Sequence, residues 1–269
     1  MNPEKTSAPA PEPASTGAPA ASNGLLVITG GSRGIGRATC LLAARRGYRV
    51  LFSYHQQAEA ARSLASRICE DGGIAEGIRA DVSVEADVLR LFETADRCPA
   101  PLAGLVNNAG VLDVQTRLED MSAERIRRIL AVNVLGVFLC AREAIRRLST
   151  RRGGPGGSIV NVSSMAARLG APNEYIDYAA SKGAMDTMTS GLAREVAGEG
   201  IRVNAVRPGL IHTEMHASGG EPGRVERLAP GVPMGRGGDP REVARAILWL
   251  LGPEASYVTG SFTDVAGGR

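Results

Sequence analysis

The chain has 269 residues, with 43% hydrophobic and 4% aromatic residues and a formal net charge of +3 at pH 7. This length suits one large domain or two small ones. The weak charge and the few aromatic residues argue against a surface that binds nucleic acid. No apolar run approaches the roughly 18 residues that span a bilayer, so we expect no membrane-spanning segment.

Residues 1–23 differ in composition from the rest and are rich in Pro, Ala, Ser and Thr. Such a segment buries too little apolar surface to order itself, so we predict a disordered tail, followed by one domain over residues 24–269. The segment also lacks the apolar stretch of a signal peptide, which favours a cytoplasmic location. The chain has four cysteines that form no CxxC pair and indicate no metal or redox site: Cys40, Cys69, Cys98 and Cys140.

From residue 24 onward, strand-like segments alternate with helical patterns. We expect strands at 25–29, 49–54, near 78, at 104–107, 157–164, 201–207 and 262–265. Helices are expected after the glycine turn to 46, then at 58–71, after 82, at 122–148, 177–197 and 239–251. This alternation predicts a single α/β domain with a doubly wound parallel sheet of about seven strands and helices on both faces. Ligands of such sheets bind beyond the carboxyl ends of the strands.

The first predicted strand runs into "TGGSRGIG", residues 29–36, which then opens a helix. Glycine permits a tight turn and lets a phosphate approach the backbone, and the helix N-terminus favours the anion. The second strand is followed by no carboxylate before Glu59, although an acidic residue there would bind an unphosphorylated ribose. Arg33 instead offers a positive charge for a 2′-phosphate. The turn therefore favours NADP over NAD.

Two further patterns carry less weight. His212 and His216 are four residues apart, but Thr213, not glutamate, follows the first histidine, so we expect no metal site. Lysine occurs only at Lys5 and Lys182. Arginine supplies every other basic side chain, which invites a chemical explanation for Lys182.

Four motifs in this order resemble the short-chain dehydrogenase/reductase family: "TGGSRGIG", "NNAG" (107–110), "YAASK" (178–182) and "RPG" (207–209). The likeness covers residues 24–269 and extends to glucose 1-dehydrogenase-like and 3-oxoacyl-reductase-like members, which the motifs do not rank. It implies a Rossmann-type sheet and a catalytic set of asparagine, serine, tyrosine and lysine. These roles fall on Asn133, Ser164, Tyr178 and Lys182, with Ser163 as the alternative serine.

The resemblance also implies the residues that bind the cofactor. Asp81 and Val82 should flank the adenine, Asn108 and Ala109 should lie beside the ribose, and Ile211 and Thr213 should hold the nicotinamide carboxamide. With the glycine turn and the catalytic pair, the predicted cofactor set is Gly30, Ser32, Arg33, Gly34, Ile35, Gly36, Asp81, Val82, Asn108, Ala109, Tyr178, Lys182, Ile211 and Thr213.

The leading interpretation is an NADP(H)-dependent oxidoreductase that interconverts a secondary alcohol or sugar hydroxyl and a carbonyl. Tyrosine has an ordinary pKa near 10, so we expect a nearby ammonium to lower the pKa of Tyr178 and let it exchange protons. The family implies that the partners are a small-molecule substrate and further copies of the chain, commonly in a homotetramer. Two alternatives remain: a 3-oxoacyl thioester reductase, and a sensor that binds NADP without turnover.

Overall fold

A computed structural model describes residues 23–269. Its core is a seven-stranded sheet of order β3-β2-β1-β4-β5-β6-β7, in which every neighbouring pair is parallel. The strands are β1 (Leu25–Ile28), β2 (Arg49–Tyr54), β3 (Ile74–Arg79), β4 (Leu102–Asn107), β5 (Gly157–Val162), β6 (Ile201–Pro208) and β7 (Phe262–Val265). The predicted doubly wound α/β fold is confirmed.

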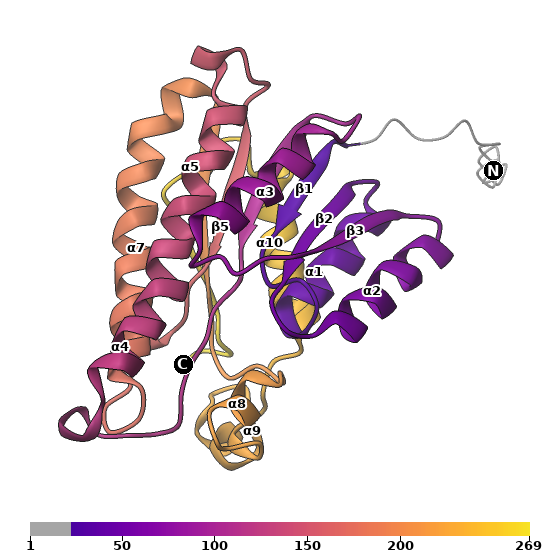
Figure 1. The fold of residues 1–269 in the computed structure, drawn as a ribbon. Helices are drawn as coiled ribbons and strands as arrows, with labels where there is room; N and C mark the ends of the chain where they lie inside the picture. The colour runs from indigo at the N-terminus through magenta and orange to yellow at the C-terminus, as the bar shows by residue number, and fades with distance from the viewer. Residues whose placement is uncertain (1–22) are drawn as a thin grey trace, which may run out of the picture.

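Helices cover both faces of the sheet (Figure 1). One face packs against α3 (Glu85–Asp96), α5 (Gly136–Leu148) and α7 (Ile176–Val196). The other packs against α1 (Gly34–Arg45), α2 (Ala58–Glu70) and α10 (Pro240–Leu251). Each face has its own buried apolar cluster, because the strands are covered on both sides.

The fourth predicted helix, residues 122–148, is interrupted. It consists of α4 (Ala123–Leu130), five residues of the wider π-helix geometry (Ala131–Leu135), and α5. Asn133 lies in the wide turn. Single π turns within α-helices occur frequently at functional sites.

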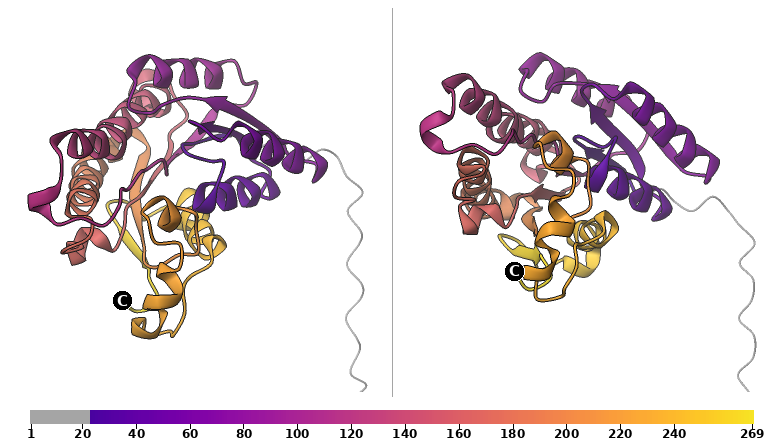
Figure 2. Two further views of the ribbon diagram at one scale, coloured as in Figure 1. Left: turned by 60° about the horizontal axis from the view of Figure 1, so that its bottom comes forward. Right: turned by 90° about the horizontal axis from the view of Figure 1, so that it is seen from below.

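Two short helices follow β6, namely α8 (Met215–Ser218) and α9 (Arg224–Leu228). Viewed from below, this segment lies in front of the sheet between the two helix layers (Figure 2). It therefore stands at the carboxyl ends of the strands, where the sequence predicts the ligand site.

Residues 1–22, nearly all of the predicted tail, lie outside the described residues. Asn23, the last residue assigned to that tail, is attached to the domain: its side chain donates to the carbonyl of Arg46 at 2.6 Å. Within residues 23–269, no helix is long and apolar enough to cross a membrane.

Candidate active site

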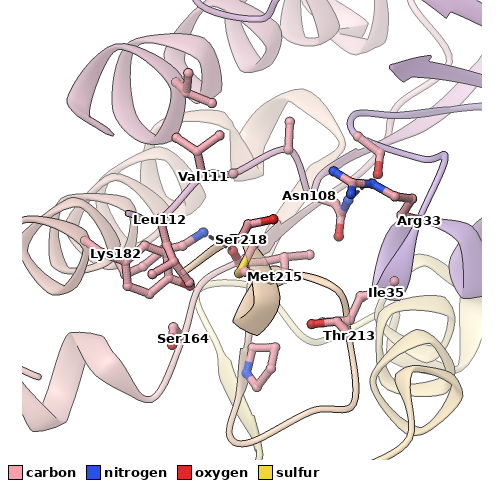
Figure 3. A pocket seen from close by; sticks show the side chains of 18 of the residues that line it. Arg33, Ile35, Asn108, Val111, Leu112, Ser164, Lys182, Thr213, Met215 and Ser218 are labelled. Atoms are coloured by element: carbon pink, nitrogen blue, oxygen red, sulfur yellow. Dashed lines mark hydrogen bonds between the residues drawn. The ribbon is translucent and has the colours of Figure 1, made fainter. Parts of the chain in front are cut away.

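A cavity of about 750 Å³ opens at the carboxyl ends of the strands. Its walls are the segments that follow six of the strands, β1 to β6, together with the start of α7 and part of the α8–α9 segment. Figure 3 shows Lys182 and Ser164 on one side of this cavity and Arg33 on the other. The sheet thus brings residues more than a hundred positions apart into one site.

The glycine turn packs closely against the end of β4. The side-chain amide of Asn108 donates to the carbonyls of Thr29 and Gly30, at 2.9 Å each. A Cβ at Gly36 would lie 2.3 Å from the Gly30 carbonyl oxygen and 2.5 Å from the Asn108 amide nitrogen. Only glycine fits at position 36, because any side chain there would push the turn away from Asn108 at the end of β4. Asn108 therefore uses its side chain to hold the turn in place.

Tyr178 and Lys182 lie one helical turn apart on α7 and both line the cavity. The Lys182 ammonium donates to the Val162 carbonyl at 2.7 Å and lies 5.6 Å from the centre of the Tyr178 ring. Burial lowers the pKa of Lys182 to about 8, although the charge of Asp186 opposes that shift. Near neutral pH this lysine can therefore both hold and release a proton.

The predicted lowering of the Tyr178 pKa is not found. Burial raises the pKa of Tyr178 above its ordinary value, and a hydrogen bond with the Ser164 side chain only partly offsets this rise. The reason is desolvation: removing the phenolate from water costs more than the local dipoles return. Within the protein alone, Tyr178 is held in its protonated, hydrogen-donating form.

The two candidate serines have different surroundings. Ser163 is buried, and its hydroxyl donates to the Asp186 carboxylate at 2.6 Å. Both serines line the cavity, but the Ser164 side chain lies beside Tyr178, and its hydroxyl oxygen accepts from the Ala166 amide at 3.1 Å. Neighbouring positions at the end of a strand point to opposite sides, so Ser164 is the serine with a hydroxyl available to a ligand.

Asn133 lies behind the cavity wall and is fully buried. Its amide exchanges two hydrogen bonds with the backbone of Val111, at 2.8 and 2.9 Å, and donates to the Ser181 hydroxyl at 3.1 Å. One lone pair of its oxygen has no partner among these bonds. A Cβ at Gly110 would lie 3.4 Å from that oxygen and 3.6 Å from the Lys182 nitrogen, so the two groups flank Gly110.

The predicted cofactor residues gather in one place. All of them line the cavity except Gly36, which supports the turn from behind. The Arg33 side chain is exposed and forms no ion pair among the described residues. Asp81 caps its own turn, accepting from the Ser83 amide at 2.9 Å and its hydroxyl at 2.6 Å. Thr213 packs against Gly34, so the segment after β6 reaches the glycine turn.

His212 and His216, the pair spaced four residues apart, contact other parts of the segment after β6. The His216 ring lies 3.0 Å from the Ile211 carbonyl oxygen, and His212 lies 3.6 Å from Glu226. No group of three or more possible metal ligands occurs within residues 23–269.

Several polar residues around the site lie outside the four sequence motifs. Tyr175 is buried under the Arg224 guanidinium, and its hydroxyl has no hydrogen-bond partner among the described residues. Arg224 in turn binds Glu174 at 2.5 and 2.9 Å. A second buried pair joins Arg125 to Asp177. These contacts link segments about 50 residues apart, and neither partner stands in a recognisable motif.

Comparison with known proteins agrees with this arrangement. Residues 30–269 match the family model described as enoyl-(acyl carrier protein) reductase. The chain is 58% identical over 245 residues to the uncharacterized oxidoreductase YgfF of Escherichia coli K12, covering 91% of this chain and 99% of that protein. It is 36% identical to glucose 1-dehydrogenase 2 of Bacillus subtilis 168, covering 90% and 93% of the two chains.

Among solved structures, a 3-ketoacyl-(acyl-carrier-protein) reductase from Brucella melitensis complexed with NADH superposes with a TM-score of 0.84. Its sequence is 33% identical, and the match covers 92% of this chain and 98% of that one. The chain belongs to the short-chain dehydrogenase/reductase family of oxidoreductases, as the four sequence motifs indicated.

Proposed function

We propose that this protein is an NADP(H)-dependent oxidoreductase that interconverts a secondary alcohol and a carbonyl, with Tyr178 as the acid/base group. The observation that carries the proposal is the convergence of Ser164, Tyr178 and Lys182 on a cavity that extends to the glycine turn. A nucleotide sensor would need the turn but not the three side chains at the other side.

The residues of the turn fit a dinucleotide. Gly30 and Gly36 let the turn pack closely against Asn108 and Ala109 at the end of β4, and Arg33 forms no ion pair within residues 23–269. We assign Arg33 to the 2′-phosphate of NADP, and Ile211 and Thr213 to the nicotinamide end. The bound nicotinamide supplies or accepts the hydride. The solved structure of the Brucella melitensis reductase contains NADH, which supports a nicotinamide cofactor for this chain.

The protein groups would handle the proton and the developing charge. Ser164 donates a hydrogen bond to the substrate oxygen, which stabilises negative charge as it forms. Tyr178 in its protonated form delivers the proton to that oxygen during reduction. Lys182 stabilises the tyrosinate that results, and its low pKa lets it pass a proton on. We assign Asn133, whose amide oxygen lies across Gly110 from Lys182, to the far end of this proton relay.

The substrate end of the cavity favours a carbonyl compound with an apolar body. Five large apolar side chains line it beyond Tyr178, beside polar ones such as Glu174, Tyr175, His216 and Ser218: Val111, Leu112, Met165, Leu169 and Met215. Arg224, a basic residue in this lining, is already bonded to Glu174 and Glu221. A sugar needs many hydrogen-bonding partners, and several polar side chains here are already bonded within the protein, Glu174 to Arg224 and His216 to the Ile211 carbonyl. Two relatives are named 3-oxoacyl- or 3-ketoacyl-(acyl-carrier-protein) reductases, so a 3-oxoacyl thioester is the second candidate substrate.

The proposal is tested by steady-state oxidation of NADPH with a panel of ketones, aldehydes, sugars and ketoacyl thioesters. We expect turnover with apolar ketones or aldehydes and weaker turnover with sugars. Binding of NADPH with no turnover across the panel would leave the sensor as the better account.

Cofactor preference tests the role of Arg33. We expect the parent protein to bind NADPH more tightly than NADH, and Arg33→Ala to reduce that preference at least about tenfold, since a charge-assisted hydrogen bond is worth roughly 1.5–3 kcal/mol. Arg37→Ala is the matched control, because Arg37 is an exposed arginine on α1, four residues after Arg33, and does not line the cavity. Equal dissociation constants for NADPH and NADH in the parent would contradict the assignment.

A further inference from the structure

A buried ion pair lies beside the proposed catalytic tyrosine. Arg125 on α4 and Asp177 in the first turn of α7 have side chains only 7% and 3% exposed. The contact is bidentate, with Nε to Oδ2 at 2.8 Å and Nη2 to Oδ1 at 3.2 Å. Burying two charges is costly, and such a pair often contributes little net stability. The presence of this buried pair therefore needs an explanation other than stability.

The remaining hydrogen bonds of the pair lead to the site. Asp177 Oδ1 accepts from the backbone N–H of Tyr178 at 2.9 Å. The Nη1 atom of Arg125 donates to the Val114 carbonyl at 2.6 Å and to the Thr116 hydroxyl at 2.9 Å. One guanidinium thus joins α4, the loop after β4 and the start of α7.

The loop is also bonded to the segment just before α7. The backbone N–H of Thr116 donates to the carbonyl of Glu174 at 3.0 Å. The same loop contributes Val111 and Leu112 to the cavity wall. Neither Arg125 nor Asp177 lines the cavity, so neither side chain can touch a substrate there.

We infer that Arg125 and Asp177 form a positioning unit that fixes Tyr178 against Ser164 and Lys182 and holds the loop wall of the substrate end. The inference rests on the proposed function, in which Tyr178 transfers the proton. A misplaced tyrosine would lower turnover, because proton transfer requires hydrogen-bonding distance in the reacting complex. Cofactor binding at the glycine turn would be left largely intact.

The test compares two isosteric substitutions of buried carboxylates. Asp177→Asn keeps the shape but leaves the Arg125 charge uncompensated. Glu143→Gln is the matched control: Glu143 has a side chain 4% exposed, binds Arg146 and Arg147 on α5, and lies away from the cavity. Both variants should lower the Tm. Only Asp177→Asn should lower kcat, by at least about tenfold at saturating substrate, with the NADPH dissociation constant changed less than about threefold.

A second measurement is independent of turnover. With lysine labelled at 13Cε, the chain gives signals only from Lys5 and Lys182. The Tyr178 ring lies over Lys182, so a displaced ring should shift the Lys182 signal in Asp177→Asn and leave it unmoved in Glu143→Gln. If Asp177→Asn does not fold, Arg125→Lys serves instead, since it keeps the charge but loses the fork of donors; it should also lower kcat and move the signal.

Retention of the parental kcat by the folded variant, or an unmoved Lys182 signal, would overturn the positioning role. A parent protein that reduces no carbonyl would instead defeat the proposed function. In that case the Lys182 signal still decides whether the pair positions Tyr178.

Discussion

Lys182 is the residue in which the composition and the site agree. Arginine serves at every other basic position of residues 23–269, yet arginine cannot lose its proton in a protein. At position 182 burial brings the pKa of the side chain to about 8. A lysine there can alternate between charge states near neutral pH, which the proposed relay requires and an arginine would prevent.

We predict that Lys182 titrates with a midpoint near 8 in the cofactor-free protein, measured by 13Cε-lysine NMR, with Lys5 as the second signal and Lys5→Arg as the assignment control. Because the pKa is lowered on folding, the folded protein binds fewer protons than the unfolded chain between pH 8 and about 10.4. Below that window the buried charge of Lys182 therefore lowers the stability of the folded state, and this penalty disappears as pH rises from 8 to about 10.4. A midpoint near the ordinary lysine value would refute the desolvation argument.

The tyrosine and lysine could be identified from their spacing in the sequence, and the serine could be narrowed to two positions. The choice between Ser163 and Ser164 depends on Asp186, which lies 23 residues beyond Ser163 and accepts its hydrogen bond. The pKa of Tyr178 likewise depends on burial by segments distant in sequence, which raises it, whereas the Tyr–Lys spacing alone predicts a lowered pKa. Local patterns identify reactive residues, whereas their solvation is a property of the folded site.

At the scale of elements, the junction between β1 and α1 depends on Gly36. An alanine there would place its Cβ against the Gly30 carbonyl and the Asn108 amide, and backbone atoms cannot move aside cheaply. We predict that Gly36→Ala opens the turn, weakens NADPH binding at least about tenfold and lowers the free energy of unfolding by about 1–3 kcal/mol.

The control for this substitution is Gly191→Ala on α7. A Cβ at Gly191 would have no heavy atom within 4 Å, and alanine favours the helix by about 1 kcal/mol. Gly191→Ala should therefore bind NADPH like the parent and be at least as stable. Calorimetric titration and urea unfolding of both variants would check this, and unchanged binding in Gly36→Ala would show that the turn tolerates a side chain.

The interrupted helix from α4 to α5 shows where sequence periodicity is insufficient. The pattern of residues 122–148 is helical throughout and predicts one helix. The wide turn around Asn133 is associated with side-chain bonds to Val111, whose position depends on the end of β4. A hydrogen-bond partner 22 residues away cannot be read from the helical pattern.

At the scale of the molecule, the alternation of strands and helices was sufficient to predict the layered sheet. The short helices α8 and α9 were not predicted, because residues 212–238 are rich in Gly and Pro and have no helical periodicity. That segment owes its shape to contacts with the rest of the chain, such as Arg224 with Glu174.

The outer surface of α4 and α5 supports a predicted homotetramer. Leu130, Leu135 and Phe138 are 40%, 48% and 50% exposed, and exposed large apolar side chains favour association. We predict a mass four times the 28.0 kDa of the chain by light scattering, and a smaller species for Leu135→Glu. A monomer mass at micromolar concentration would reject this assembly.

The most direct test of the whole account is the carbonyl-dependent oxidation of NADPH by the parent protein and by Tyr178→Phe, with cofactor titration of both. We predict that the parent turns over at least one apolar carbonyl compound. Tyr178→Phe should bind NADPH within about threefold of the parent but lose at least about 10²-fold in kcat, since it lacks the proton donor. Turnover by Tyr178→Phe within about threefold of the parent would contradict the role of Tyr178 and, with it, the proposed mechanism.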